Sequence, residues 1–379
     1  MSFVILLSFP LGSAFPQSND AIGFNTPAPH VIIMDYESGI VLFEKDARDP
    51  VAPASMTKIM TAELVFERLR NGGLTLDTEF LVSENAWRKG GADSGGSTMF
   101  LALGSTVRIE DLLRGVIVQS GNDACIVLAE GIAGSEVAFA EMMTAHAQDI
   151  GLESASFRNA TGLDQPGHEI SLYDLAKLSR RTISEFSEFY PMYSEKSFEW
   201  NGIKQGNRNP LLGRFDGADG LKTGFTKESG YGLVASAQRG DQRRIVVFNG
   251  LNSKTERRNE GMRLMQAAFD NFKAYQLYEA GQSVTKASIY MGQAKEVELV
   301  VNQDIVVGLA KLVRPRMTVT VNTQTEYAAP IMEGDQLGEL VITAPDLPTT
   351  TIPLYAAETV KRKSAFGRAL SSLVGLIRG

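Results

Sequence analysis

Cysteine and histidine are scarce in this sequence, and their scarcity limits its chemistry. The 379 residues include one cysteine, Cys125, and three histidines, His30, His146 and His168. One cysteine cannot form an internal disulfide, and no Cys/His cluster has the spacing of metal ligands. A histidine-based mechanism therefore has few candidates. We expect no metal and no other cofactor.

Basic residues and long hydrophobic runs are also limited. The formal net charge of −7 argues against nucleic acid as the main partner. The apolar run over residues 3–11 is shorter than the roughly 20 residues that span a bilayer. Because Gly12 and Ala14 follow it, the start favours a signal peptide over residues 1–14 rather than a buried strand, although no Lys or Arg precedes the run. Export agrees with a protein that has no disulfide.

The length allows two domains, and the sequence pattern changes near residue 275. "HVIIMDYESGIVLFEKD" predicts a β-hairpin, and "YGLVASAQ" with "RRIVVFNGL" predicts two later strands. Between them, Ser135 and Ser171 are expected to cap helices, the second in a capping box with Asp174. Helical spacing of apolar residues recurs over 56–69, 109–118, 123–132 and 135–150. This order predicts an α+β domain over residues 15–275, with an antiparallel sheet flanked by helices.

The remaining residues predict two further parts. Short runs rich in Val, Ile and Thr, such as "EVELVV" and "MTVTVN", predict a small all-β domain over residues 276–356. The tail, residues 357–379, has five basic residues and one acidic residue. A basic amphipathic helix here would bind an anionic membrane surface, and the alternative is a helix docked on its own domain. Its apolar face would carry Phe366, Ala369, Leu370, Leu373, Val374 and Ile377.

"SMTK" places a hydroxyl and an amine three residues apart at the start of a predicted helix. Positions i and i+3 share one helix face, so Ser55 and Lys58 are able to touch. A serine nucleophile needs a base, and lysine can serve only if its pKa falls well below about 10.4. The motif by itself is weak, because "SVTK" at Ser283 to Lys286 matches the same pattern within a predicted strand.

Two further motifs strengthen the assignment. "SGN" at Ser120, Gly121 and Asn122 lies between two predicted helices, where a loop can direct both polar side chains into a cleft. "KTG" at Lys222, Thr223 and Gly224 is expected on an edge strand, where the glycine allows a substrate backbone to approach closely. The ordered set S-x-x-K, S-G-N and K-T-G is the signature of penicillin-recognising serine acyltransferases.

Over nearly its whole length the sequence resembles the low-molecular-weight penicillin-binding proteins, in particular the D-alanyl-D-alanine carboxypeptidases of the penicillin-binding protein 5 type. The segments that carry the resemblance include "APASMTKIMTA", "GGSTMFLALG", "SGNDAC", "ATGLDQPG" and "DGLKTGFT". The resemblance implies a penicillin-binding transpeptidase/β-lactamase-like catalytic domain. It also implies that the β-rich domain and the terminal helix tether the enzyme to the periplasmic face of the inner membrane.

The resemblance also assigns catalytic roles to residues of this chain. Ser55 would be the acylated nucleophile and Lys58 its base, while Ser120 would pass a proton to the leaving D-alanine. The backbone N–H groups of Ser55 and Phe225 would form the oxyanion hole. Several relatives have His where this chain has Phe225, which affects no backbone donor but could alter the pH profile or the deacylation rate.

The remaining roles concern substrate binding. The resemblance implies that Asn122 holds the substrate amide, that Lys222 lowers nearby pKa values, and that Thr223 binds the terminal carboxylate beside Gly224. Arg257 resembles a second carboxylate contact, although the adjacent Arg258 leaves the register open. The expected partners are peptidoglycan stem peptides ending in D-Ala-D-Ala, β-lactams as covalent inhibitors, and the membrane surface.

Three other interpretations remain. A class A β-lactamase shares the motifs, but no E-x-x-x-N loop occurs between "SGN" and "KTG", so we expect slow deacylation. A peptidoglycan endopeptidase would share the whole site. A non-catalytic wall-binding scaffold is disfavoured by the intact Ser55, Lys58 and Lys222. Outside the motifs, Cys125 is expected to be a buried small hydrophobe and His146 a core residue, whereas sequence cannot place His168.

Overall fold

The computed structural model describes residues 24–345 and 347–364. The chain separates into two compact units, one ending at Phe272 and the other beginning at Lys273, each of which is described by itself. The predicted signal peptide at 1–14 lies outside the described residues, as does most of the predicted terminal helix. Among the described residues, no helix is long and apolar enough to cross a membrane.

The first unit is built on an antiparallel sheet of five strands in the order β2-β1-β9-β8-β7. The predicted N-terminal hairpin and the two later strands are confirmed. The edge strand β7 carries the K-T-G motif, as expected. The strands are β1 (His30–Asp35), β2 (Val41–Lys45), β7 (Ala218–Thr226), β8 (Gly230–Arg239) and β9 (Gln242–Leu251).

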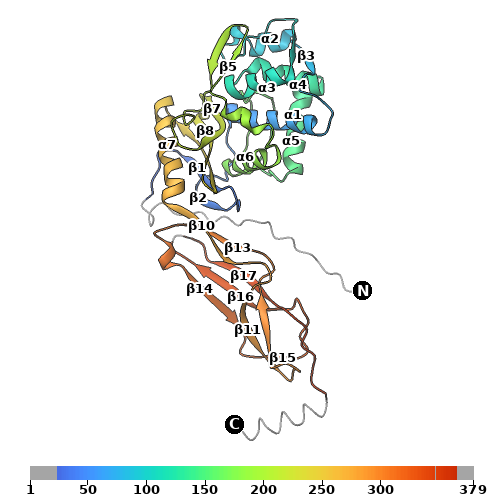
Figure 1. Cartoon of the computed structure of the whole chain (residues 1–379), viewed down its shortest axis with the longest axis vertical. Helices are drawn as coiled ribbons and strands as arrows, with labels where there is room; N and C mark the ends of the chain where they lie inside the picture. Colours follow the sequence, from blue (N-terminus) through green and yellow to red (C-terminus); the bar gives the residue numbers. More distant parts are fainter. Residues whose placement is uncertain (1–23, 346, 365–379) are drawn as a thin grey trace. The chain divides into compact units, whose positions relative to one another are not determined.

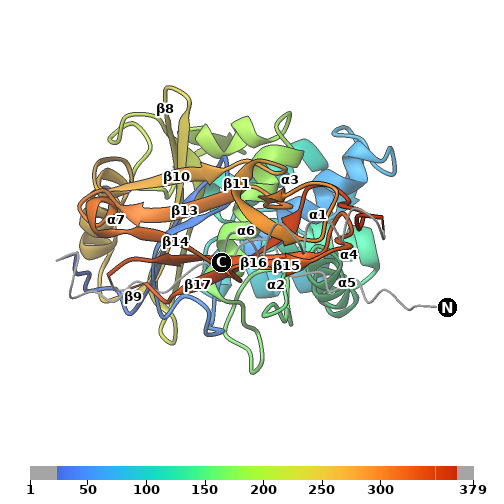
Figure 2. The same ribbon diagram turned by 90° about the horizontal axis from the view of Figure 1, so that it is seen from below.

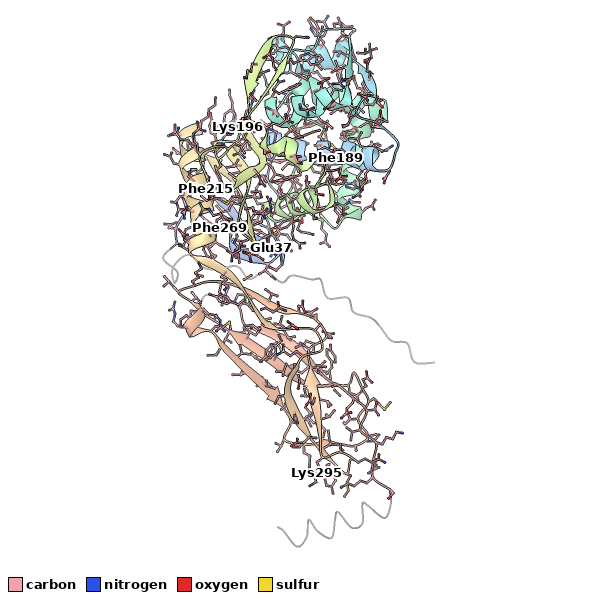
Figure 3. The ribbon with its side chains drawn as sticks, in the orientation of Figure 1. Glu37, Phe189, Lys196, Phe215, Phe269 and Lys295 are labelled. Atoms are coloured by element: carbon pink, nitrogen blue, oxygen red, sulfur yellow. The ribbon has the colours of Figure 1, made fainter. Side chains whose placement is uncertain are left out.

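Helices cover both faces of this sheet (Figure 1). Val234 and Val247 belong to the core shared with the helical region, whereas Leu233 and Phe248 face Gly261 of α7. On the α7 side, Phe269 stacks with Phe215, their ring centroids 6.3 Å apart (Figure 3). The α-helices are α1 (Lys58–Arg70), α2 (Glu84–Gly90), α3 (Ile109–Arg114), α4 (Asn122–Ala133), α5 (Glu136–Asp149), α6 (Leu172–Glu185) and α7 (Lys254–Asp270).

The helix starts agree with the serine caps predicted from sequence. Ser135 accepts a hydrogen bond from the Ala138 amide and begins α5, and Ser171 accepts one from the Asp174 amide and begins α6. The second hydrogen bond of the predicted capping box, from the Ser171 amide to the Asp174 carboxylate, is absent. The carboxylate accepts hydrogen bonds from Ser154 instead. This unit also has two small two-stranded antiparallel sheets: β3 (Glu79–Leu81) with β4 (Thr106–Arg108), which α2 separates in the sequence, and the hairpin of β5 (Ser197–Trp200) with β6 (Ile203–Gly206).

The second unit is all β, as predicted. Its larger sheet has the order β14-β16-β17-β12-β11-β15, and Figure 2 shows β14, β16 and β17 side by side. In β11 the residues Ser283 and Lys286 are exposed, so the decoy "SVTK" lies on a strand surface. The strands are β10 (Phe272–Tyr278), β11 (Ser283–Tyr290), β12 (Glu296–Val300), β13 (Ile305–Ala310), β14 (Thr318–Thr323), β15 (Tyr327–Ala328), β16 (Gln336–Thr343) and β17 (Thr350–Ala356).

The start of the predicted terminal helix is wrong. Residues 357–364 are not helical: Val360 bridges Ile331 and Arg362 bridges Gly292, each in antiparallel fashion. The Lys363 amide continues this pairing by donating to Met291 O. Backbone pairing with the β unit outweighs the helical pattern over these residues. The predicted apolar face, which begins at Phe366, lies outside the described residues.

Candidate active site

Ser55 lies in a short 3₁₀ turn, Ala54–Thr57, that leads directly into α1. Lys58 is the first residue of α1, and its side chain is only 1% exposed. Its Nζ atom lies 3.0 Å from Ser55 Oγ, 2.8 Å from Asn122 Oδ1 and 2.5 Å from the backbone oxygen of Thr161. The predicted contact between Ser55 and Lys58 is therefore present, and two further acceptors hold the amine.

Strand β7 brings the K-T-G motif against this turn. A Cβ atom at Gly224 would lie 2.8 Å from Pro53 O and 3.3 Å from Ala54 Cβ, so a larger residue would push the strand away. Close approach at Gly224 places the backbone of Phe225 beside the turn that holds Ser55. Thr223 is buried, and its backbone oxygen accepts a hydrogen bond from Lys222 Nζ at 3.3 Å.

Ser120 connects the S-G-N and K-T-G motifs. Its Oγ lies 2.8 Å from Lys222 Nζ, and both side chains are 2% exposed. A π-helical turn, Gly115–Gln119, precedes Ser120 and ends in a left-handed conformation at that residue, with φ of 61°. A non-glycine residue in this region is a strained backbone position, of a kind that clusters at functional sites. Asn122 then begins α4, so that both polar side chains of the motif face the two lysines.

The electrostatics of the site favour uncharged amines. Burial lowers the pKa of Lys58, because the ammonium loses its hydration, and the positive charge of Arg208 lowers it further. Burial lowers the pKa of Lys222 well below its usual value, and the charges of Lys58 and Arg208 act in the same direction. The pKa of Lys58 is therefore shifted in the direction that a role as base requires.

Arg208 is a residue near the site to which sequence reasoning gave no role. Its charge affects Lys58, Lys222 and Arg257, which places its guanidinium near all three. The backbone around it is fixed by two asparagines, since Asn207 Nδ2 donates to Tyr193 O and Asn209 Nδ2 donates to Gly220 O. The available signal was "NRNP", an arginine between two turn-forming asparagines shortly before the K-T-G strand.

The choice between Arg257 and Arg258 is clear from their surroundings. Arg257 is 8% exposed, donates from Nη1 to Gly224 O at 3.2 Å, and leaves Nε without a partner. Its guanidinium also lies 5.4 Å from the Tyr231 ring centroid, and that same ring stacks with Phe225, their centroids 4.1 Å apart. Arg258 is exposed and donates to Asn259. Arg257 is therefore the arginine beside K-T-G.

Residues 159–168 form a loop behind the Ser55 turn, and sequence analysis gave its members no role. It supplies Thr161 O to Lys58, and a Cβ atom at Gly162 would lie 1.9 Å from Ala54 O. His168 anchors the loop: its Nδ1 accepts from the Arg158 amide, so Nε2 carries the hydrogen and donates to Thr57 Oγ1 at 2.8 Å. Burial, with the charge of Arg158, lowers the pKa of His168 to about 4, which keeps it neutral.

Cys125 and His146 lie outside the three motifs, and their surroundings give each a structural role. Cys125 is fully buried in α4, and burial raises the pKa of its thiol to about 11, so it behaves as the expected small hydrophobe. His146 is 11% exposed and lies 3.5 Å from both Glu63 and Glu67, so it belongs to a polar cluster rather than to the apolar core. Within the described part of the chain, no three His, Cys, Asp or Glu side chains gather as metal ligands.

Comparisons with known proteins agree with this geometry. A family described as "D-alanyl-D-alanine carboxypeptidase" matches residues 17–253, and one described as "Penicillin-binding protein 5, C-terminal domain" matches residues 272–362. The D-alanyl-D-alanine carboxypeptidase DacD of Escherichia coli K12 is 37% identical over 369 residues, covering 96% of this chain and 95% of that protein.

Solved structures give the same result. The D-alanyl-D-alanine carboxypeptidase DacD of Francisella tularensis aligns with a TM-score of 0.79 and 32% identity, covering 90% of this chain and 95% of that one. The ampicillin-bound form of penicillin-binding protein D2 from Listeria monocytogenes aligns with a TM-score of 0.56 and 29% identity, covering 65% of this chain and 99% of that one. The first family match spans more than half of the sequence. The chain therefore belongs to the D-alanyl-D-alanine carboxypeptidase family.

Proposed function

We propose that this chain is a serine-type carboxypeptidase that removes the terminal D-alanine from peptidoglycan pentapeptide stems through an acyl-enzyme on Ser55. The observation that carries the proposal is the set of three oxygens around Lys58 Nζ. Asn122 Oδ1 and Thr161 O are acceptors only, so they take both hydrogens of a neutral amine. Its lone pair is then left for the hydroxyl of Ser55.

Acylation follows from this arrangement. Ser55 Oγ attacks the carbonyl carbon of the penultimate D-alanine while its proton passes to Lys58 Nζ. The carbonyl oxygen becomes an oxyanion, which the backbone N–H groups of Ser55 and Phe225 stabilise. Collapse of the tetrahedral intermediate breaks the C–N bond and leaves an ester on Ser55.

Ser120 and Lys222 act on the leaving group. The departing D-alanine nitrogen needs a proton, which the Ser120 hydroxyl delivers at the moment the C–N bond breaks. The proton that Lys58 took from Ser55 replaces the one that Ser120 gives up, and Lys222 Nζ, which donates to Ser120 Oγ at 2.8 Å, stabilises the alkoxide character at Ser120 during this transfer. Water then hydrolyses the ester and returns Ser55 to its free form.

Substrate orientation falls to three further residues. Asn122 holds the substrate amide, while Thr223 and Arg257 bind the terminal carboxylate beside Gly224. The unpartnered Nε of Arg257 supports this role, because a buried donor without an acceptor is satisfied by an incoming anion. β-Lactams would acylate the same serine, in keeping with the ampicillin-bound form of the Listeria protein.

Mass spectrometry after incubation with benzylpenicillin tests the proposal. We expect one covalent adduct on the wild-type protein, none on Ser55→Ala, and an unchanged adduct on Ser283→Ala, which removes the serine of the exposed decoy. D-Alanine release from a pentapeptide ending in D-Ala-D-Ala should follow the same pattern. An unmodified wild-type protein that releases no D-alanine would instead favour a non-catalytic scaffold.

Among enzyme alternatives, a β-lactamase is the less favoured. Glu169 is exposed, and its backbone pairs with Ser156, so it is not placed as a buried carboxylate beside Ser55. We therefore expect slow deacylation, and rapid nitrocefin turnover without a trapped adduct would overturn that expectation. An endopeptidase would share this site. It would be identified if the protein converts cross-linked dimers into monomers and releases no D-alanine.

We also propose a periplasmic location at the surface of the inner membrane. The support comes from the composition of the two ends: an apolar start over residues 3–11, and a tail of five basic residues and one acidic residue over 357–379. The apolar positions from Phe366 to Ile377 would lie in the headgroup region, and the basic residues would bind anionic lipids.

A further inference from the structure

Asp123 is a buried carboxylate beside the active site that belongs to none of the three motifs. It follows Asn122 in the first turn of α4, and its side chain is 0% exposed. Among the described residues no Lys or Arg forms an ion pair with it, so hydrogen-bond donors must replace its lost hydration. Those donors are Thr98 Oγ1 at 2.7 Å, the amides of Met99 at 2.8 Å and Leu101 at 3.1 Å, and the amide of Ala124 at 2.9 Å.

Three of these four donors come from one stretch, residues 96–101, which we call the Asp123-bound segment. Its residues from Ser97 to Leu101 are in neither helix nor strand, so contacts with the rest of the domain must fix its position. Besides the bonds to Asp123, the Gln205 amide of β6 donates to Thr98 O at 3.0 Å. The carboxylate therefore accepts most of the hydrogen bonds that tie this segment to the rest of the domain.

The Asp123-bound segment lies directly against Asn122. The backbone N–H of Asn122 donates to Ser97 O at 2.7 Å. A Cβ atom at Gly96 would lie 2.8 Å from Nδ2 of the Asn122 side chain. On its other side, Asn122 Oδ1 accepts from Lys58 Nζ. Contact with the segment at Nδ2 and with Lys58 at Oδ1 holds the amide in a single orientation.

We propose that Asp123 is a positioning residue for acylation: it fastens the Asp123-bound segment against Asn122, and thereby keeps Oδ1 on Lys58 and Nδ2 available to the substrate. This inference rests on the proposed acyl-enzyme on Ser55. If the segment moves away, the Asn122 amide is free to rotate. Lys58 then loses one of the two acceptors that direct its lone pair toward Ser55.

The first test is the rate of acylation in Asp123→Asn. The amide keeps the volume of the carboxylate, but its NH₂ group replaces one of the two oxygens. That group then faces the Met99 and Ala124 amides at the Oδ1 position, or the Leu101 amide at the Oδ2 position, and cannot accept from them. We expect the second-order rate constant for acylation by a fluorescent penicillin to fall by about tenfold to a hundredfold, the range that small misplacements near reacting groups produce. The rate is compared at the plateau of each pH profile, because the substitution also removes a charge near Lys58. An unchanged plateau would overturn the proposal.

A double-mutant cycle separates positioning from a merely structural role. If Asp123 acts through Asn122, then Asp123→Asn lowers the acylation rate little further in a protein that already carries Asn122→Ala. Equal losses in both backgrounds would contradict the proposal. The matched control is Asp174→Asn, since Asp174 is also buried and accepts from a backbone amide and a hydroxyl of Ser154. Its effect should be the same with and without Asn122→Ala.

Thr98→Val is the second variant, for use if Asp123→Asn does not fold. It removes the 2.7 Å bond to Asp123 while leaving the carboxylate intact. We expect a smaller loss of acylation rate that disappears in the Asn122→Ala background, and persistence of the loss there would contradict the proposal. Failure of the proposed function looks different, because the wild-type protein itself would then form no adduct.

Discussion

The amine of Lys58 lies 3.0 Å from the hydroxyl of Ser55, with both groups at the entry to one helix and the amine enclosed by protein. The other two neighbours of that amine, Asn122 Oδ1 and Thr161 O, are able only to accept hydrogen bonds. The direction of the lone pair is thus determined by residues from α4 and from the 159–168 loop. The proposed base catalysis at Ser55 would therefore depend on these two distant segments as well as on the motif itself.

Replacing Lys58 with alanine should therefore abolish most of the acylation. General-base catalysis contributes about 10² to 10⁴ in rate, and we expect a loss in that range for penicillin acylation. Lys58→Arg should fail equally, because a guanidinium stays protonated and offers no lone pair. The measurement is the rate of adduct formation by stopped flow. Lys286→Ala, in the exposed decoy, should react like the wild type, and loss of rate there would argue against the assignment of Lys58.

Removing the charge of Arg208 should shift the rise of acylation rate with pH to higher pH. Positive charge at Arg208 lowers the pKa values of Lys58 and Lys222, so Arg208→Ala should raise both. Because the neutral form of Lys58 is the active one, the rise of acylation rate with pH then occurs at higher pH. Arg208→Lys, which keeps the charge, should retain the wild-type profile. Identical profiles for wild type and Arg208→Ala would show that Arg208 has no electrostatic role.

Arg257 and Arg258 offer a matched pair for the carboxylate site. Hydrogen bonds to charged groups contribute roughly 1.5–3 kcal/mol, so Arg257→Ala should lower kcat/KM for a D-Ala-D-Ala peptide by about tenfold to a hundredfold. The loss should be much smaller for the same peptide with an amidated C-terminus, which has no carboxylate to bind. Arg258→Ala should leave both rates unchanged. A larger effect of Arg258 than of Arg257 would reverse the assignment.

His168 makes the stability of the protein depend on pH. Its pKa falls from the ordinary value of 6.5 to about 4 in the folded state, so the unfolded chain binds more protons between these values. Stability from neutral His168 is complete above pH 6.5 and is lost as pH falls toward 4, by about 3 kcal/mol in all.

Denaturant unfolding at a series of pH values checks this dependence. His168→Gln is expected to be less stable at pH 7 but to lose less stability between pH 6.5 and 4 than the wild-type protein. Parallel stability curves for the two proteins over this pH range would contradict the assignment of the depressed pKa to His168.

Two substitutions in the tail test the proposed membrane contact. Leu373→Glu adds a negative charge to the predicted apolar face, and Ser372→Glu adds the same charge to the predicted polar face. Binding to vesicles that contain anionic lipid, measured by co-sedimentation of the full chain, should be lost in the first variant and retained in large part by the second. Equal losses would indicate binding through net charge without insertion of the apolar face.

The parts of the site that sequence could predict are local in the chain. Ser55 and Lys58 share a helix start, and Lys222 and Gly224 share a strand, so their spacing already implies their proximity. Arg208 and Thr161 O could not be found in this way. They approach Lys58 only through tertiary packing, and a backbone oxygen leaves no trace in residue type.

The same reasoning explains the fold predictions that differed. The capping box at Ser171 has the expected residue types, but Ser154 competes for the Asp174 carboxylate. The helix predicted over 357–379 rests on an apolar face that begins at Phe366, and before that residue Val360 and Arg362 pair with the β unit. Local propensity is a weak preference that tertiary hydrogen bonds override.

Strand β7 ends the sheet, with β8 on one side and no neighbouring strand on the other among the described residues. A peptide that aligns with this open edge is recognised through its own backbone, whose N–H and C=O groups are the same for every residue. Selectivity then depends on the end of the chain, through its carboxylate and the chirality of the last two residues. An enzyme built in this way should cleave peptides that end in the same two residues at similar rates, whichever residue precedes them.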